Sequence, residues 1–159
     1  MTGTGWIMET VGEFLAKKGA DVFNLRPNAT VIEALELMAE KNIGAVVVMD
    51  EEKRIHGIFS ERDYARKMIT KGRSAHTTKV KEIMTTLLVS VNPDTRIHEC
   101  MALMTEKRIR HLPVLSGEKL VGVVSIGDVV KSVLTEQEMV ISQQAYKIDQ
   151  LENYISLTP

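Results

Sequence analysis

The chain repeats itself, and this repeat limits its possible folds more than any other feature. When Pro27 is set on Pro93, identical residues coincide along the stretch that follows: Glu33 with Glu99, Leu37 with Leu103, Met38 with Met104, Glu40 with Glu106, Lys41 with Lys107, Ile43 with Ile109 and Val48 with Val114. With one residue dropped in a turn, Gly57 then falls on Gly122, Ser60 on Ser125 and Asp63 on Asp128. Upstream, residues 11–15 fall on residues 80–84. We therefore expect two tandem copies of one structural unit.

Each copy shows the pattern β-α-β-β-α. In the first copy, a capping box at Thr30 and Glu33 predicts the start of a helix that runs to about residue 42 and has apolar residues at helical spacing. Two β-branched runs, residues 45–49 and 55–59, flank a charged turn and predict a hairpin. A short extended piece precedes this helix, at residues 22–25 in the first copy and 89–91 in the second. A second helix follows the hairpin, and a short helical lead-in precedes each copy.

The predicted fold class is α+β, with two β-α-β-β-α repeats and an extended C-terminal helix. A unit of about sixty residues buries too little surface to be stable alone, so we expect the copies to pack together about a pseudo-twofold axis. The predicted bounds are residues 10–72 and 73–135 for the repeats and 136–159 for the extension. From the end of the second repeat through the extension, apolar residues recur every seventh position, as on a helix that packs on a second chain: Leu134, Ile141, Ile148 and Ile155. Gln137 and Gln144 share that seam and favour a docked helix over a long coiled coil.

Composition excludes several classes of partner. The chain has 20 Lys and Arg against 21 Asp and Glu, so it lacks the net positive charge of a protein that wraps duplex DNA. Aromatic residues make up 4%, too few for a platform that stacks single-stranded bases. A single cysteine, Cys100, excludes an internal disulfide framework. The first ten residues contain no signal-peptide pattern and the longest apolar run is residues 45–49, so we expect a cytoplasmic protein without membrane contact.

One motif recurs at the end of each predicted hairpin: Gly-hydrophobic-hydrophobic-Ser-x-x-Asp, ending in Asp63 and in Asp128. Its structural interpretation is that Ser60 and Ser125 cap the next helix, while the negative charges of the aspartates interact favourably with the dipole of that helix. Its functional interpretation is that the helix N-terminus binds an anion and the aspartate accepts hydrogen bonds from both ribose hydroxyls. The occurrence of the motif at equivalent positions of both copies favours the functional interpretation.

The repeat, the two motifs and the run from Arg110 to Val114 resemble a tandem pair of cystathionine-β-synthase (CBS) domains, the Bateman module. Met84 and Thr85 before a strand fit the second copy of that pair as well. The resemblance covers most of the chain, from about residue 11 to 134, with small stand-alone bacterial and organellar members the most similar. It implies a regulatory or sensor module that binds AMP, ADP, ATP or NAD in clefts between the copies and forms a homodimer.

The resemblance also implies roles for individual residues. Asp63 and Asp128 would bind ribose hydroxyls, with Ser60 and Ser125 beside sugar or phosphate. Phosphate would be faced by a larger set: Thr85, Arg110, His111, Arg62 and Arg66. Pro113 and the strand that begins at Val89, together with Met84 and Ala45, would complete the walls around adenine and sugar. The first copy has Gly44-Ala45 where the second has Arg110-His111, so we expect unequal sites, the better one combining Asp128 with Arg110.

Other functions are less consistent with the residues. His98, Glu99 and Cys100 point in different directions on a helix and no second cluster of ligands exists, so we expect no metal site. No repeated histidine accompanies Ser60 and Ser125 and no Walker loop occurs, so we expect neither an enzyme nor a catalytic cofactor. The basic stretch at residues 70–79 is a weak signal for nucleic acid. The remaining alternative is a dimerising scaffold for a partner protein whose nucleotide clefts are vestigial.

Overall fold

The computed structural model describes residues 8–19, 21–86 and 89–157. The first repeat contains β1 (Asn24–Leu25), α2 (Val31–Lys41), the hairpin of β2 (Ala45–Met49) and β3 (Ile55–Ser60), and α3 (Glu61–Lys67) followed by the 3₁₀ helix η1 (Ile69–Lys71). Strand β2 is central, parallel to β1 and antiparallel to β3. Thr30 and Glu33 form the predicted capping box at the start of α2. The predicted element order of the first repeat is confirmed.

The second repeat contains α5 (Ile97–Lys107), the hairpin of β4 (His111–Ser116) and β5 (Lys119–Ser125), and α6 (Ile126–Leu157). Its sheet has two strands. The strand expected at residues 89–91 is reduced to one parallel bridge between Val91 and Val114. The two residues before this stretch, Leu87 and Leu88, lie outside the described residues. The mixed helix-and-strand fold with two repeats agrees with the predicted class.

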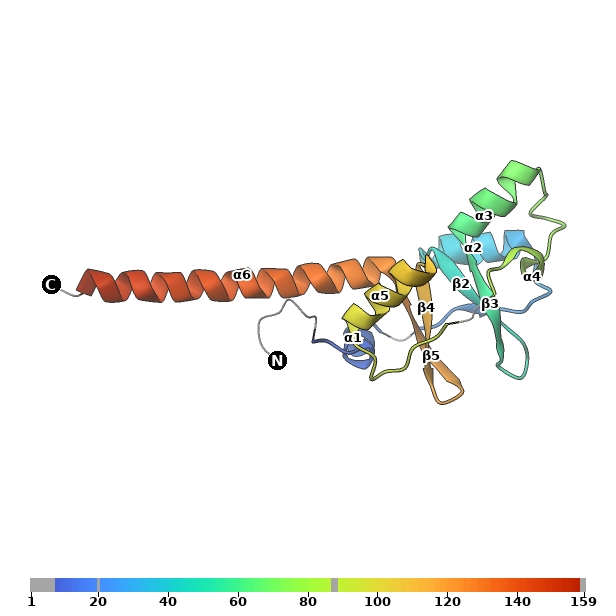
Figure 1. Ribbon diagram of the computed structural model, residues 1–159. Coiled ribbons are helices and arrows are strands. Elements are labelled where there is room, and N and C mark those ends of the chain that lie inside the picture. The colour runs from blue at the N-terminus through green and yellow to red at the C-terminus, as the bar shows by residue number, and fades with distance from the viewer. Residues whose placement is uncertain (1–7, 20, 87–88, 158–159) are drawn as a thin grey trace.

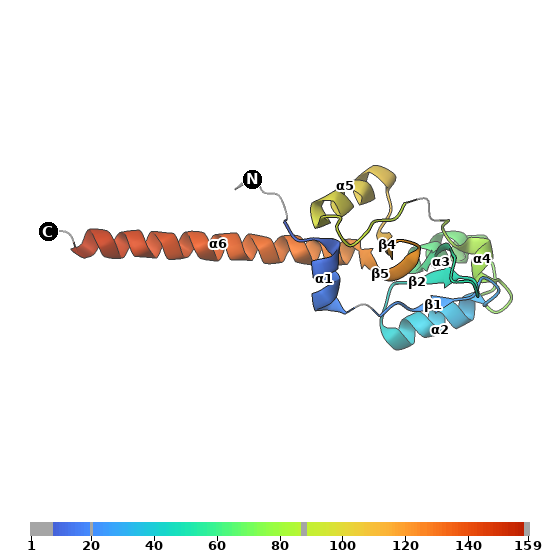
Figure 2. The same cartoon turned by 90° about the horizontal axis from the view of Figure 1, so that it is seen from below.

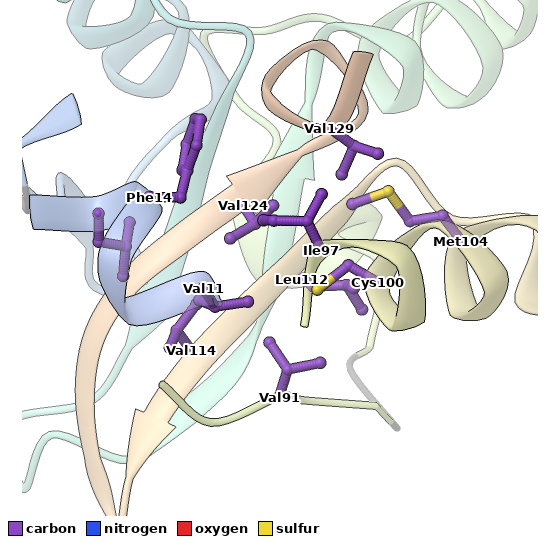
Figure 3. Close-up of a cluster of buried hydrophobic side chains, with 11 residues drawn as sticks. Val11, Phe14, Val91, Ile97, Cys100, Met104, Leu112, Val114, Val124 and Val129 are labelled. Atoms are coloured by element: carbon purple, nitrogen blue, oxygen red, sulfur yellow. The ribbon is translucent and has the colours of Figure 1, made fainter. Parts of the chain in front are cut away.

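The two lead-in helices are exchanged between the repeats. Helix α1 (Val11–Lys18) precedes the first repeat, yet Val11 and Phe14 lie in the core of the second, among Ile97, Cys100 and Leu112 (Figure 3). Helix α4 (Val80–Ile83) precedes the second repeat and packs in the core of the first, with Val31 and Phe59. The sequence repeat predicted both helices but not their exchange.

Equivalent backbone bonds fix both exchanged segments. The bridge from Thr10 to Arg96 matches the bridge from Thr30 to Lys79, which is its counterpart under the repeat. Val11 N–H donates to the carbonyl oxygen of Thr95 at 2.7 Å, and Val80 N–H donates to that of Ala29 at 2.8 Å. The repeats are thus related by pseudo-twofold symmetry. A third apolar cluster joins their sheets, with Val47, Met49 and Ile58 packed against Leu120 and Val123.

Helix α6 begins inside the second repeat and then leaves the body of the molecule. Val129 is fully buried in its first turns, and Ser132 Oγ donates to Glu9 Oε2 at 2.6 Å. Figures 1 and 2 show the rest of the helix as a rod that projects away from both repeats. Each side chain from Gln137 to Asn153 is exposed. Within the described residues, every helix is too short or too polar to cross a membrane.

The glycine of each repeated motif lies where an exchanged segment approaches a strand. A Cβ atom on Gly57 would lie 2.5 Å from the carbonyl oxygen of Thr85, just after α4. A Cβ atom on Gly122 would lie 2.7 Å from Leu15 Cδ1, on α1. Only the absence of a side chain permits these contacts. The motif glycines therefore serve the exchange rather than a turn.

We predict that Gly57→Ala destabilises the protein more than Gly122→Ala. At Gly57 the added methyl meets backbone, which can move only with α4, so the expected cost is about 1–3 kcal/mol. At Gly122 it meets the end of the flexible Leu15 side chain, which can change rotamer. Urea unfolding of the two variants measures the difference. Equal losses would show that close approach to the exchanged backbone is not what the glycine permits.

Candidate functional site

The repeated serine and aspartate form capping boxes at both helix starts. Ser60 Oγ accepts from Asp63 N–H at 3.2 Å, and Asp63 Oδ2 accepts from Ser60 N–H at 3.0 Å. Ser125 and Asp128 repeat the arrangement at 3.1 and 2.8 Å. The structural interpretation of the motif is therefore correct. It does not exclude the functional interpretation, because each aspartate also lines a cleft between the repeats.

The cleft at Asp63 is small and strongly cationic. Its volume is about 210 Å³. Ser60, Asp63 and Thr85 form one side, and cationic side chains from both repeats surround them: Arg62, Arg66, Lys67, Arg108 and Arg110. The pKa of Arg62 is lowered, first by the charge of Arg66, then by burial and by Arg110. This mutual repulsion makes the cleft favourable for an anion.

Asp63 itself is closely held. It is 7% exposed, and its Oδ1 accepts from Thr85 Oγ1 at 2.9 Å and lies 3.1 Å from Lys67 Nζ. Thr85 reaches this position because it follows the exchanged helix α4 and pairs with Ile58 of β3. Thr85, which the sequence predicted only to face phosphate, thus contacts an aspartate of the motif as a consequence of the exchange.

The cleft at Asp128 is larger and nearly neutral. Its volume is about 410 Å³, and much of its wall is backbone and aliphatic side chain, including Gly44, Ala45 and Val47 from the first repeat. Lys18, at the end of α1, enters it: Lys18 Nζ lies 2.7 Å from Asp128 Oδ2 and donates to the carbonyl oxygen of Val123 at 3.2 Å. Asp21 also lines this cleft, so two carboxylates, Asp21 and Asp128, face the one ammonium group of Lys18.

The structure corrects the expected pairing of Asp128 with Arg110. Arg110 lines the Asp63 cleft, and the neutral pair Gly44 and Ala45 lines the Asp128 cleft. The reason is the pseudo-twofold relation, which sets the start of the hairpin of one repeat against the aspartate of the other. The expected inequality of the two clefts remains, but the cationic one is built on Asp63. His111, one residue after Arg110, lines both clefts.

Three predicted site residues lie outside the walls found for these clefts. Met84 packs against the core of the first repeat, and Val89 packs against the core of the second. Pro113 is buried in β4, paired with Val123. Sequence reasoning missed four charged residues that also line the clefts: Lys18, Asp21, Lys67 and Arg108. They lie outside the repeated motif, and Lys18 enters its cleft only because α1 is exchanged.

His111 is the titratable group shared by both clefts. Burial lowers its pKa, against the attraction of Asp128 and Asp63, and the charges of Lys18 and Arg110 lower it further. The lowered pKa favours the neutral form of the imidazole. Among the described residues, no group of three or more His, Cys, Asp or Glu is placed to hold a metal ion. Cys100 is buried in the core of the second repeat, and burial raises its thiol pKa to about 11.

Comparison with known proteins identifies the repeated unit. A family model described as the CBS domain matches residues 11–70 and again residues 80–135. The chain is 40% identical over 144 residues to the CBS domain-containing protein CBSX3, mitochondrial, of Arabidopsis thaliana, covering 86% of this chain and 70% of that one.

Two solved structures are similar in fold. A putative signal-transduction protein with CBS domains from Burkholderia ambifaria is 50% identical, with a TM-score of 0.76 and coverage of 80% of this chain and 96% of that one. The CBS domain pair of protein MJ0100, solved in complex with 5′-methylthioadenosine and S-adenosyl-L-methionine, has a TM-score of 0.68 over 77% of this chain and 93% of that one. At 22% identity, the second shows the shared fold alone.

We predict that acidification destabilises the protein through His111. The pKa of His111 in the folded state lies below the unfolded value of about 6.5. The contribution of the neutral imidazole to the free energy of unfolding is therefore complete above pH 6.5 and is lost as the pH falls through the folded-state pKa. Between pH 7 and 5.5, the free energy of unfolding should fall less steeply in His111→Gln than in the wild type. The two slopes should differ by up to about 1.4 kcal/mol per pH unit. The exposed His76→Gln is the control and should keep the wild-type slope. A slope unchanged in His111→Gln would contradict the prediction.

Proposed function

Because the chain belongs to the CBS-domain proteins and carries the domain as a tandem pair, we propose that it is a regulatory module that binds adenosine nucleotides between its two repeats. We propose no reaction for it: it acts as a homodimer on a partner protein, and the ligand changes how it does so. The observation that carries this proposal is the pair of clefts, each lined by both repeats and each containing a capped aspartate at a helix start.

The aspartates suit ribose. A carboxylate held by its own helix N-terminus keeps a fixed orientation, and its oxygens accept hydrogen bonds from the adjacent hydroxyls of the sugar. In the Asp128 cleft, Lys18 Nζ forms an ion pair with Asp128 Oδ2. A ribose hydroxyl that donates to this oxygen displaces Lys18, which can then bind a phosphate of the same ligand. In the Asp63 cleft, Thr85 and Lys67 contact the Asp63 carboxylate. A ribose that binds this carboxylate would displace them in the same way.

The charges of the clefts distinguish ADP and ATP from AMP. The Asp63 cleft contains four arginines, whose planar guanidinium groups bind phosphate oxygens in pairs, so it is suited to a di- or triphosphate. The Asp128 cleft contains Lys18 opposed by Asp21 and Asp128, together with His111, whose pKa is lowered by burial, and a larger apolar wall. It is suited to an adenosine compound of low charge, such as AMP or NAD.

Binding between the repeats provides a route to regulation. A nucleotide that contacts both repeats stabilises the mutual orientation in which both sets of contacts are made. It shifts the population of that orientation only by its difference in affinity for the two states. Cleft residues come from both repeats and from the exchanged segments, so a change in orientation alters the surface of the whole pair rather than one loop.

We predict that adenosine nucleotides raise the melting temperature and that ATP binding depends on the arginines of the Asp63 cleft. A ligand at about 100 times its dissociation constant should add about 2.7 kcal/mol of stability. In Arg66→Ala and Arg110→Ala, the affinity for ATP should fall roughly tenfold or more, because each variant loses a charge-assisted hydrogen bond. Affinity for AMP in the Asp128 cleft should fall mainly in Asp128→Ala.

Lys119→Ala is the matched control, since it removes one positive charge at the exposed tip of the β4–β5 hairpin. Calorimetry with ATP, ADP, AMP and NAD measures each affinity. An equal loss of ATP affinity in Lys119→Ala would indicate a general effect of net charge, which contradicts a phosphate site at Asp63. If none of the four nucleotides binds, the sensor function is wrong and a dimerising scaffold remains.

A further inference from the structure

Helix α6 carries an apolar stripe that its own chain does not cover. The stripe comprises Val130, Leu134, Ile141, Ile148 and Leu151, which are 49–62% exposed. These residues recur at heptad spacing: Leu134, Ile141 and Ile148 at one seam position, Val130 and Leu151 at the other, together with Gln137 and Gln144. The CBS-domain match ends at residue 135, so most of the stripe lies beyond the second domain.

A helix in this setting needs a partner. From Gln137 to Asn153 the described side chains are all exposed, and Figures 1 and 2 both show this part of α6 clear of the repeats. Most of the stability of a helix in a protein comes from packing of its apolar face, and β-branched isoleucines add little helix propensity. Within the described residues this stretch of α6 is clear of both repeats, so a partner for its apolar face has to come from another chain.

We infer that α6 pairs with α6 of a second copy of this chain as a parallel, in-register, two-stranded coiled coil. The spacing of Leu134, Ile141 and Ile148 is the repeat that such a seam requires. The stripe begins at Val130, in the part of α6 that still packs in the second repeat, so the paired region starts beside the two bodies and extends away from them. The side chains at the other seam position, which include Leu151, pack between those of the second helix as well.

The charges beside the seam select a parallel second copy. Lys147 lies on one flank of the stripe, and Glu138 and Glu152 lie on the other. In a parallel pair, Lys147 of each helix faces Glu152 of the second copy, and symmetry makes this contact twice. An antiparallel pair sets like flanks together, so that Glu138 of one helix meets Glu152 of the other. That arrangement replaces two attractions by acidic repulsion.

The glutamines of the seam are consistent with this arrangement. In a parallel, in-register pair, Gln144 lies opposite Gln144 of the second copy, and the two amides can donate to and accept from each other. Polar residues in a seam lower its stability but specify its register, as a buried asparagine does. A seam with two glutamines and about three heptads is therefore specific and weak, and it associates stably only when the bodies are also held together.

Disulfide crosslinking tests this inference on the full chain. In a Cys100→Ala background, Gln137→Cys and Gln144→Cys should each form a disulfide with the same residue of a second copy, doubling the mass on a non-reducing gel. An antiparallel pair brings like residues together at only one point along its length, so crosslinking at both positions requires a parallel pair. Tyr146→Cys, exposed on the opposite side of α6, is the control and should remain uncrosslinked.

Each outcome decides the inference. Crosslinking at both seam positions but not at 146 supports it, and adding Ile148→Asp should then abolish crosslinking at 144 while Met139→Asp, away from the stripe, should not. Crosslinking at one seam position alone, at neither, or equally at 146 overturns it. All these positions are exposed in α6, so an unchanged circular dichroism spectrum and melting temperature verify that each variant is folded.

Discussion

The whole structure depends on the exchange of the two lead-in helices. Each apolar core is completed by a helix from the other repeat, since Val11 and Phe14 lie in the second core while Val80 lies in the first. Neither repeat can bury its own core without the other, and the motif glycines admit the exchanged segments at distances that a side chain would prevent. The same exchange delivers Lys18 to one cleft and Thr85 to the other.

The capped aspartates show how one arrangement serves both fold and site. Ser60 and Asp63 satisfy donors at the start of α3, which any helix start requires. The same bonds hold the Asp63 carboxylate rigid at a cleft between the repeats. Pseudo-symmetry then provides two such clefts, and they differ because the other walls differ: arginines at Asp63, backbone and aliphatic groups at Asp128. Duplication thus provides the shared geometry, and divergence provides the charge.

Local patterns predicted the elements of this molecule, and long-range placement limited the prediction of the site. The capping box at Thr30, the two hairpins and the helix after Ser60 follow from residues close in sequence. The exchange of α1 and α4 does not, because each helix has the same apolar face whichever core receives it. The pairing of Arg110 with the Asp63 cleft was missed for the same reason: it depends on how one repeat lies on the other.

The continuity of α6 has a mechanical consequence. Asp128 lies in its first turn, and the helix runs unbroken for 32 residues, a length of about 48 Å at 1.5 Å per residue. Its first turns are packed in the core of the second repeat through Val129, and its far end is clear of both repeats. Over that length, a change of about 5° in the direction of the helix corresponds to a displacement of about 4 Å at the far end. A small reorientation of the packed turns thus corresponds, at the tip, to a shift approaching the pitch of one helical turn.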